Sequence, residues 1–247
     1  MGGLHKGHEI LIKKAKKKNK NALVSIFVNP KQFNSKNDFK TYPRNFNNDV
    51  KILKNLRVKY LYCPKYKDIF SFKTRNKIYL HSFSKRLCGK YRPGHFKGVL
   101  NVVNRFLELL KPKYLFLGKK DFQQLTLIKQ HIKKNKINTT VVSCKTVRDQ
   151  ASLPFSTRNF NLKKHDKILA SKVFKFLKKE KAYIKSKKIK KINLSNVKKK
   201  ILNIGVKKID YIEVINLDNL NKAKKYSENF NIFSAFYVGK VRLIDNF

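Results

Sequence analysis

The sequence has few cysteines and no long apolar run, and each shortage excludes a class of protein. Its 247 residues include three cysteines, Cys63, Cys88 and Cys144, which are widely spaced and form no CxxC pair. Such a set predicts neither a zinc site nor a disulfide framework and favours a reducing cytoplasm. No apolar stretch approaches the roughly 18 residues needed to span a bilayer, and no signal-like segment opens the chain. We therefore expect a cytoplasmic protein that does not cross a membrane.

Acidic residues are also scarce: 14 Asp and Glu stand against 60 Lys and Arg, giving a formal charge of +46. A charge of this size first suggests a nucleic-acid binder, because lysines gain affinity by releasing phosphate counterions. The basic residues, however, are mostly lysines spread through every segment, without an arginine stripe interleaved with stacking aromatics. They accompany abundant Asn, Ile, Phe and Tyr, the residues of A/T-rich codons. We attribute the charge to composition, do not expect nucleic acid as a partner, and expect anionic substrates to be attracted.

The apolar pattern predicts two domains. Through the first three fifths of the chain, short apolar runs alternate with helical periodicity, which is typical of an α/β fold with a parallel sheet covered by helices on both faces. The predicted strands cover residues 21–28, 58–63, 114–117 and 139–143. Beyond them the chain is richer in lysine, and residues 230–244 alternate enough to close a smaller α+β domain with strands. We expect domains of residues 1–146 and 147–247.

The first eight residues carry the most informative motif. His5 and His8 lie three apart across Gly7, directly before a helical pattern that begins at Glu9. Histidines at this spacing share one side of a helix's first turn, beside backbone N–H groups that lack an intrahelical partner. Glycines there let a polyphosphate approach the backbone and the positive end of the helix dipole. The motif predicts nucleotide chemistry, although two histidines in a glycine-rich turn can also be structural.

Polar side chains follow the predicted strands, where ligands of open parallel sheets bind. After residues 21–28, Gln32 has an amide suited to a carboxylate or hydroxyl, or is solvated in a proline turn. After the last strand, Ser156 and Arg158 are suited to a triphosphate, or form a helix cap. His95, in a rigid polar loop, is either substrate-facing or solvated. Spacing alone does not choose between these alternatives.

The segment after residues 114–117 has two interpretations as well. Lys120 can bind a nucleotide phosphate as a point charge. Asp121 and Gln124 have the spacing of a capping box, so both can instead satisfy helix N–H groups.

Taken in order, seven segments closely resemble the pantothenate synthetase family. They are MGGLHKGH, SIFVNPKQF, TYPR, RPGHFKGV, GKKDFQQ, FSTRN and GKVRLIDN, which together span nearly the whole chain. The resemblance implies a Rossmann-like domain, a smaller C-terminal lid domain, a homodimer, and ATP with Mg²⁺. It also implies two reactions, in which ATP first activates pantoate as pantoyl adenylate with release of pyrophosphate. The amine of β-alanine then displaces AMP to give pantothenate.

The resemblance also implies roles for individual residues. His8 would be the proton donor, and His5, Lys120 and Arg158 would act with it by neutralising charge on the phosphates. Gln32 and Gln124 would hold pantoate, with Gln32 also near β-alanine. The residues expected to surround ATP are Met1, Gly2, Gly3, Leu4, His5, Lys6, Gly7, His8, Gly118, Lys119, Lys120, Asp121, Val147, Phe155, Ser156, Thr157 and Arg158. The metal ligands stay unassigned.

The chain departs from the family pattern at four places. The family has a strand ending in Pro-Thr before the residue equivalent to Met1, so we expect a central strand of the sheet to be missing. Lys119 and Cys88 replace acidic residues, and Ala151-Ser152 replaces an Asp-Gly pair. If a positive φ is required at the second of these, Ser152 strains the loop that carries Ser156 and lowers activity. The alternatives to an active ligase are an RNA-binding or tRNA-charging HxGH protein and a decayed, inactive family member.

Overall fold

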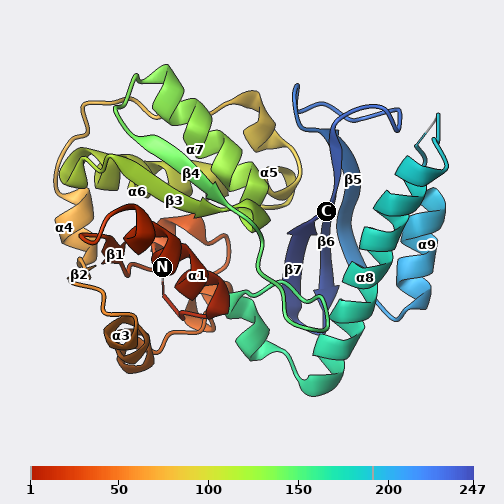
Figure 1. The fold of residues 1–247 in the computed structure, drawn as a ribbon, viewed down its shortest axis with the longest axis horizontal. Coiled ribbons are helices and arrows are strands. Elements are labelled where there is room, and N and C mark those ends of the chain that lie inside the picture. The colour runs from red at the N-terminus through yellow and green to blue at the C-terminus, as the bar shows by residue number, and fades with distance from the viewer. Residues whose placement is uncertain (1, 191) are drawn as a thin grey trace. The chain divides into compact units, whose positions relative to one another are not determined.

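The computed structural model describes residues 2–190 and 192–247, which divide into two compact units (Figure 1). The first unit comprises residues 2–147 together with Phe155–Thr157, and the second comprises Arg148–Pro154 and Arg158–Phe247. The chain thus passes between units at Val147, and a three-residue segment then returns to the first unit. Within the described residues no helix is long and apolar enough to cross a membrane.

The first unit alternates strands and helices. Its elements are α1 (Lys6–Lys18), β1 (Leu23–Ser25), η1 (Pro30–Gln32), α2 (Lys36–Lys40), α3 (Phe46–Asn55), β2 (Tyr60–Tyr62), α4 (Tyr66–Phe70), η2 (Ser82–Lys85), α5 (Cys88–Tyr91), α6 (His95–Leu110), β3 (Tyr114–Gly118), η3 (Lys119–Asp121), α7 (Phe122–Lys134) and β4 (Thr140–Cys144). The strands predicted from the sequence are present, but β1 and β2 are shorter than their apolar runs. The unit has the predicted Rossmann-like α/β fold.

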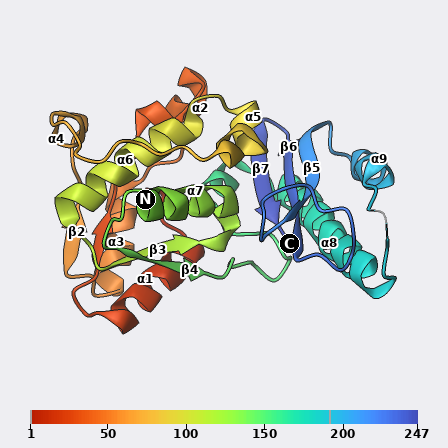
Figure 2. The same ribbon diagram turned by 90° about the horizontal axis from the view of Figure 1, so that it is seen from above.

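Its strands form two parallel pairs instead of one continuous sheet. Strand β1 pairs with β2, and β3 pairs with β4. Figure 2 shows α1 on one face of the β3–β4 pair and α7 on the other, the arrangement expected of a doubly covered parallel sheet. In the part of the chain that the structure describes, no strand pairs with both β1 and β3.

Apolar side chains fill both sides of these strands. Between α6, α7 and the β3–β4 pair lie Val99, Leu100, Leu107, Ile128 and Ile132, all at most 7% exposed. A second cluster joins α1, β1 and α3. It consists of Leu4, Ile12, Val24 and Leu53. Because Leu4 belongs to the second cluster, the HxGH segment is fixed to the core immediately before its first histidine.

The second unit is a three-stranded antiparallel sheet with two helices packed on it. Its elements are α8 (Lys164–Ser186), α9 (Ser195–Asn203), β5 (Lys208–Asn216), β6 (Phe230–Val238) and β7 (Val241–Asn246), preceded by η4 (Thr157–Asn161), which begins in the first unit. The strand order is β5-β6-β7. Fully buried Phe174 and Leu177 of α8 pack with Phe236 of β6 in one core. This is the expected α+β domain, although strand β5 was not predicted.

Candidate functional site

The turn from Gly2 to His5 is held on both sides by buried side chains. The carboxylate of Asp49, which is 1% exposed, accepts hydrogen bonds from Gly3 N at 2.9 Å and Leu4 N at 2.6 Å. On the other side, the hydroxyl of buried Thr157 lies 3.0 Å from the carbonyl oxygen of Gly3. Gly3 has φ +62°, and a Cβ atom there would lie 2.4 Å from Thr157 Cγ2. Only glycine therefore fits this turn.

His5 is the N-cap of helix α1. Its Nδ1 accepts a hydrogen bond from Gly7 N at 3.1 Å, so this nitrogen carries no proton and the remaining proton lies on Nε2. Burial, together with the positive charge of Lys120, lowers the pKa of His5 to about 4. At neutral pH His5 is therefore a neutral ring with a fixed tautomer.

His8 lies against His5, one turn into the same helix. The ring centroids are 3.9 Å apart with 28° between the planes, and the Phe155 ring stacks with His5 at 6.3 Å between centroids. Burial, followed by the neighbouring His5, holds the pKa of His8 well below its usual value. Among the described residues, the buried Nδ1 atom of His8 has no hydrogen-bond partner. An unpaired buried polar atom is costly and needs an explanation, and a ligand that bonds it provides one.

These charge states correct one expectation. The two imidazoles were expected to face a polyphosphate as cations, but both are neutral in the free protein at neutral pH. A neutral ring can still donate one hydrogen bond to a phosphate oxygen, and a bound anion raises the pKa of the imidazole that it contacts. The permanent positive charge at this place comes from Lys120.

Lys120 and Asp121 lie close to the histidine pair. The charge of Lys120 acts on the pKa of both His5 and His8, and that of Asp121 acts on His5. The Lys120 side chain is 17% exposed, and its ammonium is 3.3 Å from the Asp121 carboxylate. Asp121 is the N-cap residue of α7, but its side chain makes no cap hydrogen bond, so the capping-box interpretation is wrong. These two charges therefore lie near the histidines and pair with each other.

The loop after strand β1 is held by the RPGH segment. His95 Nδ1 lies 2.7 Å and Arg92 Nη2 3.1 Å from the backbone oxygen of Gln32, so His95 is not simply solvated. Buried Asn29 donates to the backbone oxygen of Gly98 at 3.0 Å. A Cβ atom on Gly98 would lie 2.2 Å from the oxygen of Lys31, so glycine lets α6 approach this closely. The backbone of Gln32 is thereby fixed.

Of the three glutamines considered, two keep free amides. Within residues 2–190 and 192–247, the side chains of Gln32 and Gln124 have no hydrogen-bond partner. The adjacent Gln123 is different, because its amide donates to the oxygens of Phe83 and Arg86 and accepts from Cys88 N at 3.1 Å. Gln123 thus holds the turn before α5, while the other two amides are available to a ligand.

The predicted residues that follow strand β4 divide between the two units. Phe155 N donates to Val147 O at 3.0 Å, which places the start of the FSTRN segment in the first unit with the histidines. Ser156 and Thr157 belong to the same unit, whereas Arg158 belongs to the second. Met1 lies outside the described residues.

Sequence reasoning missed Asp49 and Gln123, and it named Thr157 only as a neighbour of ATP and not as a residue that holds the histidine turn. Asp49, Thr157 and Gln123 bond backbone groups that are 35 to 155 residues away in sequence. No local pattern marks such contacts.

The loop from Asp149 to Pro154 confirms the expected strain. Ser152, where the resemblance implies glycine, has φ +73°. Ser152 N donates to Asp149 O at 3.0 Å and Leu153 N to Asp149 Oδ1 at 2.9 Å, closing a tight turn that requires this conformation. For a non-glycine residue this conformation costs about 1–2 kcal/mol.

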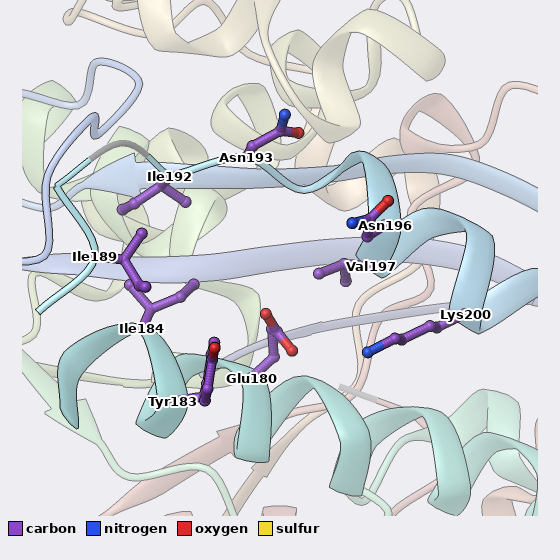
Figure 3. Close-up of a pocket in the computed structure, with 9 residues that line it drawn as sticks. All are labelled: Glu180, Tyr183, Ile184, Ile189, Ile192, Asn193, Asn196, Val197 and Lys200. Atoms are coloured by element: carbon purple, nitrogen blue, oxygen red, sulfur yellow. The ribbon is translucent and has the colours of Figure 1, made fainter. Parts of the chain in front are cut away.

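A pocket of about 380 Å³ lies elsewhere, within the second unit (Figure 3). It is lined by Glu180, Tyr183, Ile184, Ile189, Ile192, Asn193, Asn196, Val197 and Lys200, from α8, α9 and the segment between them. None of the predicted site residues is among them. In the described part of the chain there is also no group of three His, Cys, Asp or Glu side chains arranged to hold a metal ion.

Comparisons with known proteins agree on one family. The family model for pantoate-β-alanine ligase matches residues 1–247. The pantothenate synthetase of Francisella tularensis subsp. novicida is 43% identical over 251 residues, which cover 100% of this chain and 86% of the relative.

Solved structures give the same result. A pantoate-β-alanine ligase from Francisella tularensis, complexed with β,γ-ATP and β-alanine, matches with a TM-score of 0.83 and 43% identity, covering 100% of this chain and 86% of that one. A pantothenate synthetase from Thermus thermophilus matches with a TM-score of 0.87 and 27% identity, covering 100% of this chain and 90% of that one. The chain therefore belongs to the pantoate-β-alanine ligase family.

Proposed function

We propose that this protein joins pantoate and β-alanine to form pantothenate, using ATP and passing through pantoyl adenylate. One observation carries the proposal: the stacked, neutral pair His5 and His8 stands at the start of α1 beside Lys120, with a buried His8 nitrogen left unpaired among the described residues. A helix N-terminus, two imidazoles and an ammonium form a site for phosphate groups. Membership of the ligase family argues against a tRNA-charging function.

In the first reaction a pantoate carboxylate oxygen attacks the α-phosphorus of ATP, and the bond to pyrophosphate breaks. This step needs alignment of two anions and neutralisation of charge on the leaving group. Lys120 supplies the permanent charge. His8 and His5 donate hydrogen bonds from their rings, and His8 becomes a proton donor once the bound phosphates raise its pKa.

We assign ATP to residues 1–8, 118–121, 147 and 155–158. Supporting this, Phe155 stacks on His5, Phe155 N donates to Val147 O, and Lys120 acts on both histidines, so residues from all four segments meet within the first unit. Arg158 is proposed as the guanidinium that contacts the phosphates.

We assign pantoate to Gln32 and Gln124, and β-alanine to Gln32. Their amides are neutral and have no partner among the described residues, so they can orient a carboxylate without competing with its charge. In the second reaction the β-alanine nitrogen attacks the carbonyl carbon of the adenylate, loses a proton and displaces AMP.

Mg²⁺ is proposed to enter with ATP. The described residues offer no cluster of three metal ligands, which suits an ion held mainly by phosphates and waters with one or two carboxylates. Asp121, 46% exposed and close to His5, is the carboxylate available at this place. The bound ion would neutralise charge on the phosphates.

We further propose a homodimer, as the resemblance implies. Sedimentation of the purified protein tests this, and a single monomeric species at micromolar concentration would contradict it.

The proposed activity is tested by isotope exchange between pyrophosphate and ATP. Exchange should require pantoate and Mg²⁺, and added tRNA should have no effect. Release of AMP should in addition require β-alanine. Exchange that depends on tRNA and an amino acid would support the charging function instead, and no exchange from a folded protein would mark an inactive family member.

A further inference from the structure

Asp49 differs from most carboxylates of this chain in its surroundings. It is 1% exposed, yet among residues 2–190 and 192–247 no cationic side chain pairs with it. Burying a carboxylate is costly unless its oxygens are hydrogen-bonded. Both oxygens are: each accepts one backbone N–H, from Gly3 and from Leu4. Both of these hydrogen bonds go to the same turn, which runs from Gly2 to His5.

That turn determines where the histidines lie. Gly3 adopts φ +62° and Gly2 φ +151°, so the chain bends sharply before His5 begins helix α1. Bonds from backbone N–H groups to a carboxylate are stronger than those between neutral groups. Thr157 completes the contact from the other side through the oxygens of Gly2 and Gly3. The turn is thus fixed at both its N–H groups and its carbonyls.

We propose that Asp49, together with Thr157, is a positioning residue for the ligase reaction: it clamps the Gly2–His5 turn and so places the stacked His5 and His8 rings against ATP. Asp49 does not touch substrate in this account and acts only through the turn. The proposal rests on the function proposed above.

The test compares Asp49→Asn with Glu108→Gln. Glu108 is a matched control because it also accepts two consecutive backbone N–H groups of the first unit, from Arg75 at 3.0 Å and Asn76 at 2.9 Å. In each variant the new amide nitrogen lies next to a backbone N–H group from which it cannot accept a hydrogen bond. Both should lower the melting temperature, but only one should disturb the histidines.

We expect Asp49→Asn to lower kcat/KM for ATP by about 100-fold, because small displacements of reacting groups cost this much. The NMR titration of the His5 ring should also move, its pKa rising from about 4 towards 6.5 as the turn loosens and the ring gains solvent. Glu108→Gln should change neither value by more than about twofold.

If Asp49→Asn loses stability but keeps kcat/KM for ATP and the His5 titration, Asp49 only stabilises the fold and the proposal is wrong. If Asp49→Asn does not fold, the His5 titration of Thr157→Val is measured instead, since this variant removes the opposite contact of the turn. Only the titration is used there, because Thr157 is itself among the residues assigned to ATP, and an unchanged His5 titration in that variant would equally overturn the proposal. The wild-type protein could also show no pyrophosphate exchange while Asp49→Asn still shifts the His5 titration. That result would contradict the proposed function but would leave the role of Asp49 in fixing the Gly2–His5 turn intact.

Discussion

The imidazole of His5 stacks on that of His8 with 3.9 Å between the ring centroids, yet the two rings have different surroundings. His5 uses Nδ1 to cap helix α1 through Gly7 N, whereas the buried Nδ1 of His8 has no partner among the described residues. The His5 ring thus stabilises the fold through its hydrogen bond, whereas the Nδ1 atom of His8 can bind a ligand. This difference makes the two histidines separable by mutation.

His8→Ala should reduce the rate of pantoate-dependent pyrophosphate exchange by about 100-fold or more, the usual size of general acid contributions. Its melting temperature should stay close to that of the wild type, because no hydrogen bond of the fold is lost. Thermal unfolding alongside the exchange assay checks both. A loss of stability as large as that of His131→Ala, which removes a fully buried and bonded ring, would identify His8 as structural instead.

His5→Asn and His5→Ala should separate capping from chemistry. Asparagine can accept the Gly7 N–H, so His5→Asn should keep the stability of α1, while His5→Ala should lose about 1 kcal/mol. Both variants should lose exchange activity to a similar extent, because neither has an imidazole. Equal loss of stability in the two variants would show that the cap seen in the structure contributes little.

Stability should fall as the pH is lowered from about 6.5 towards 5. Burial lowers the pKa values of His5, His8 and His131, so in this range the unfolded chain binds more protons than the folded one. Their contribution is complete above the unfolded pKa of about 6.5 and is lost as the pH drops towards the folded values. For His131, Nδ1 accepts from Tyr79 N, which a proton would prevent. Melting curves of His131→Gln should show a weaker pH dependence than those of the wild type, and parallel curves would contradict this.

Ser152→Gly should raise the free energy of unfolding by about 1 kcal/mol by removing the strain of φ +73°. The neighbouring Gln150 has no positive φ, so Gln150→Gly should lower stability by roughly 0.5–1 kcal/mol through the entropy of the unfolded chain. Opposite signs in chemical denaturation would support the strain account. Turnover should rise in Ser152→Gly if the strain reaches Ser156.

Gln124→Leu and Gln123→Leu are adjacent changes with different expected outcomes. Gln123 satisfies one buried carbonyl, one partly buried carbonyl and one N–H, so its loss should cost about 1–3 kcal/mol of stability. Gln124 has no partner in the described chain, so its replacement should mainly raise the KM for pantoate. Steady-state kinetics at saturating ATP, together with unfolding curves, distinguish the two. A raised pantoate KM in both variants would mean that the turn before α5 also shapes the site.

Much of the fold could be predicted from hydrophobic periodicity. The helix α6 and strands β3, β4, β6 and β7 lie where the apolar pattern placed them, since their buried faces repeat with the period of the element. Strand β5, by contrast, was not predicted. It begins at Lys208 in a lysine-rich segment, and charged residues alternate there with the buried apolar ones. In so lysine-rich a chain, charge no longer marks loops.

The site was predictable as a set of motifs but not as a geometry. Lys120 and the histidines were recognised because they occur in local sequence runs. The capping role of Asp121 was wrong, since the pattern of a capping box does not determine which way its side chains turn. Asp49 and Gln123 act over long sequence separations and follow from three-dimensional packing alone. The charge of an imidazole likewise depends on burial, which no motif encodes.

Gly98 has a consequence for how this enzyme can change over evolutionary time. Its missing side chain allows a helix backbone to lie directly on the carbonyl of Lys31, next to Gln32. Even alanine there would force the two backbones apart and shift the amide proposed to select the acid. Replacement of Gly98 by lysine, asparagine or any other residue is therefore not tolerated, although such residues are common elsewhere in the chain. A single glycine thus supports both the packing of α6 and the position of the Gln32 amide.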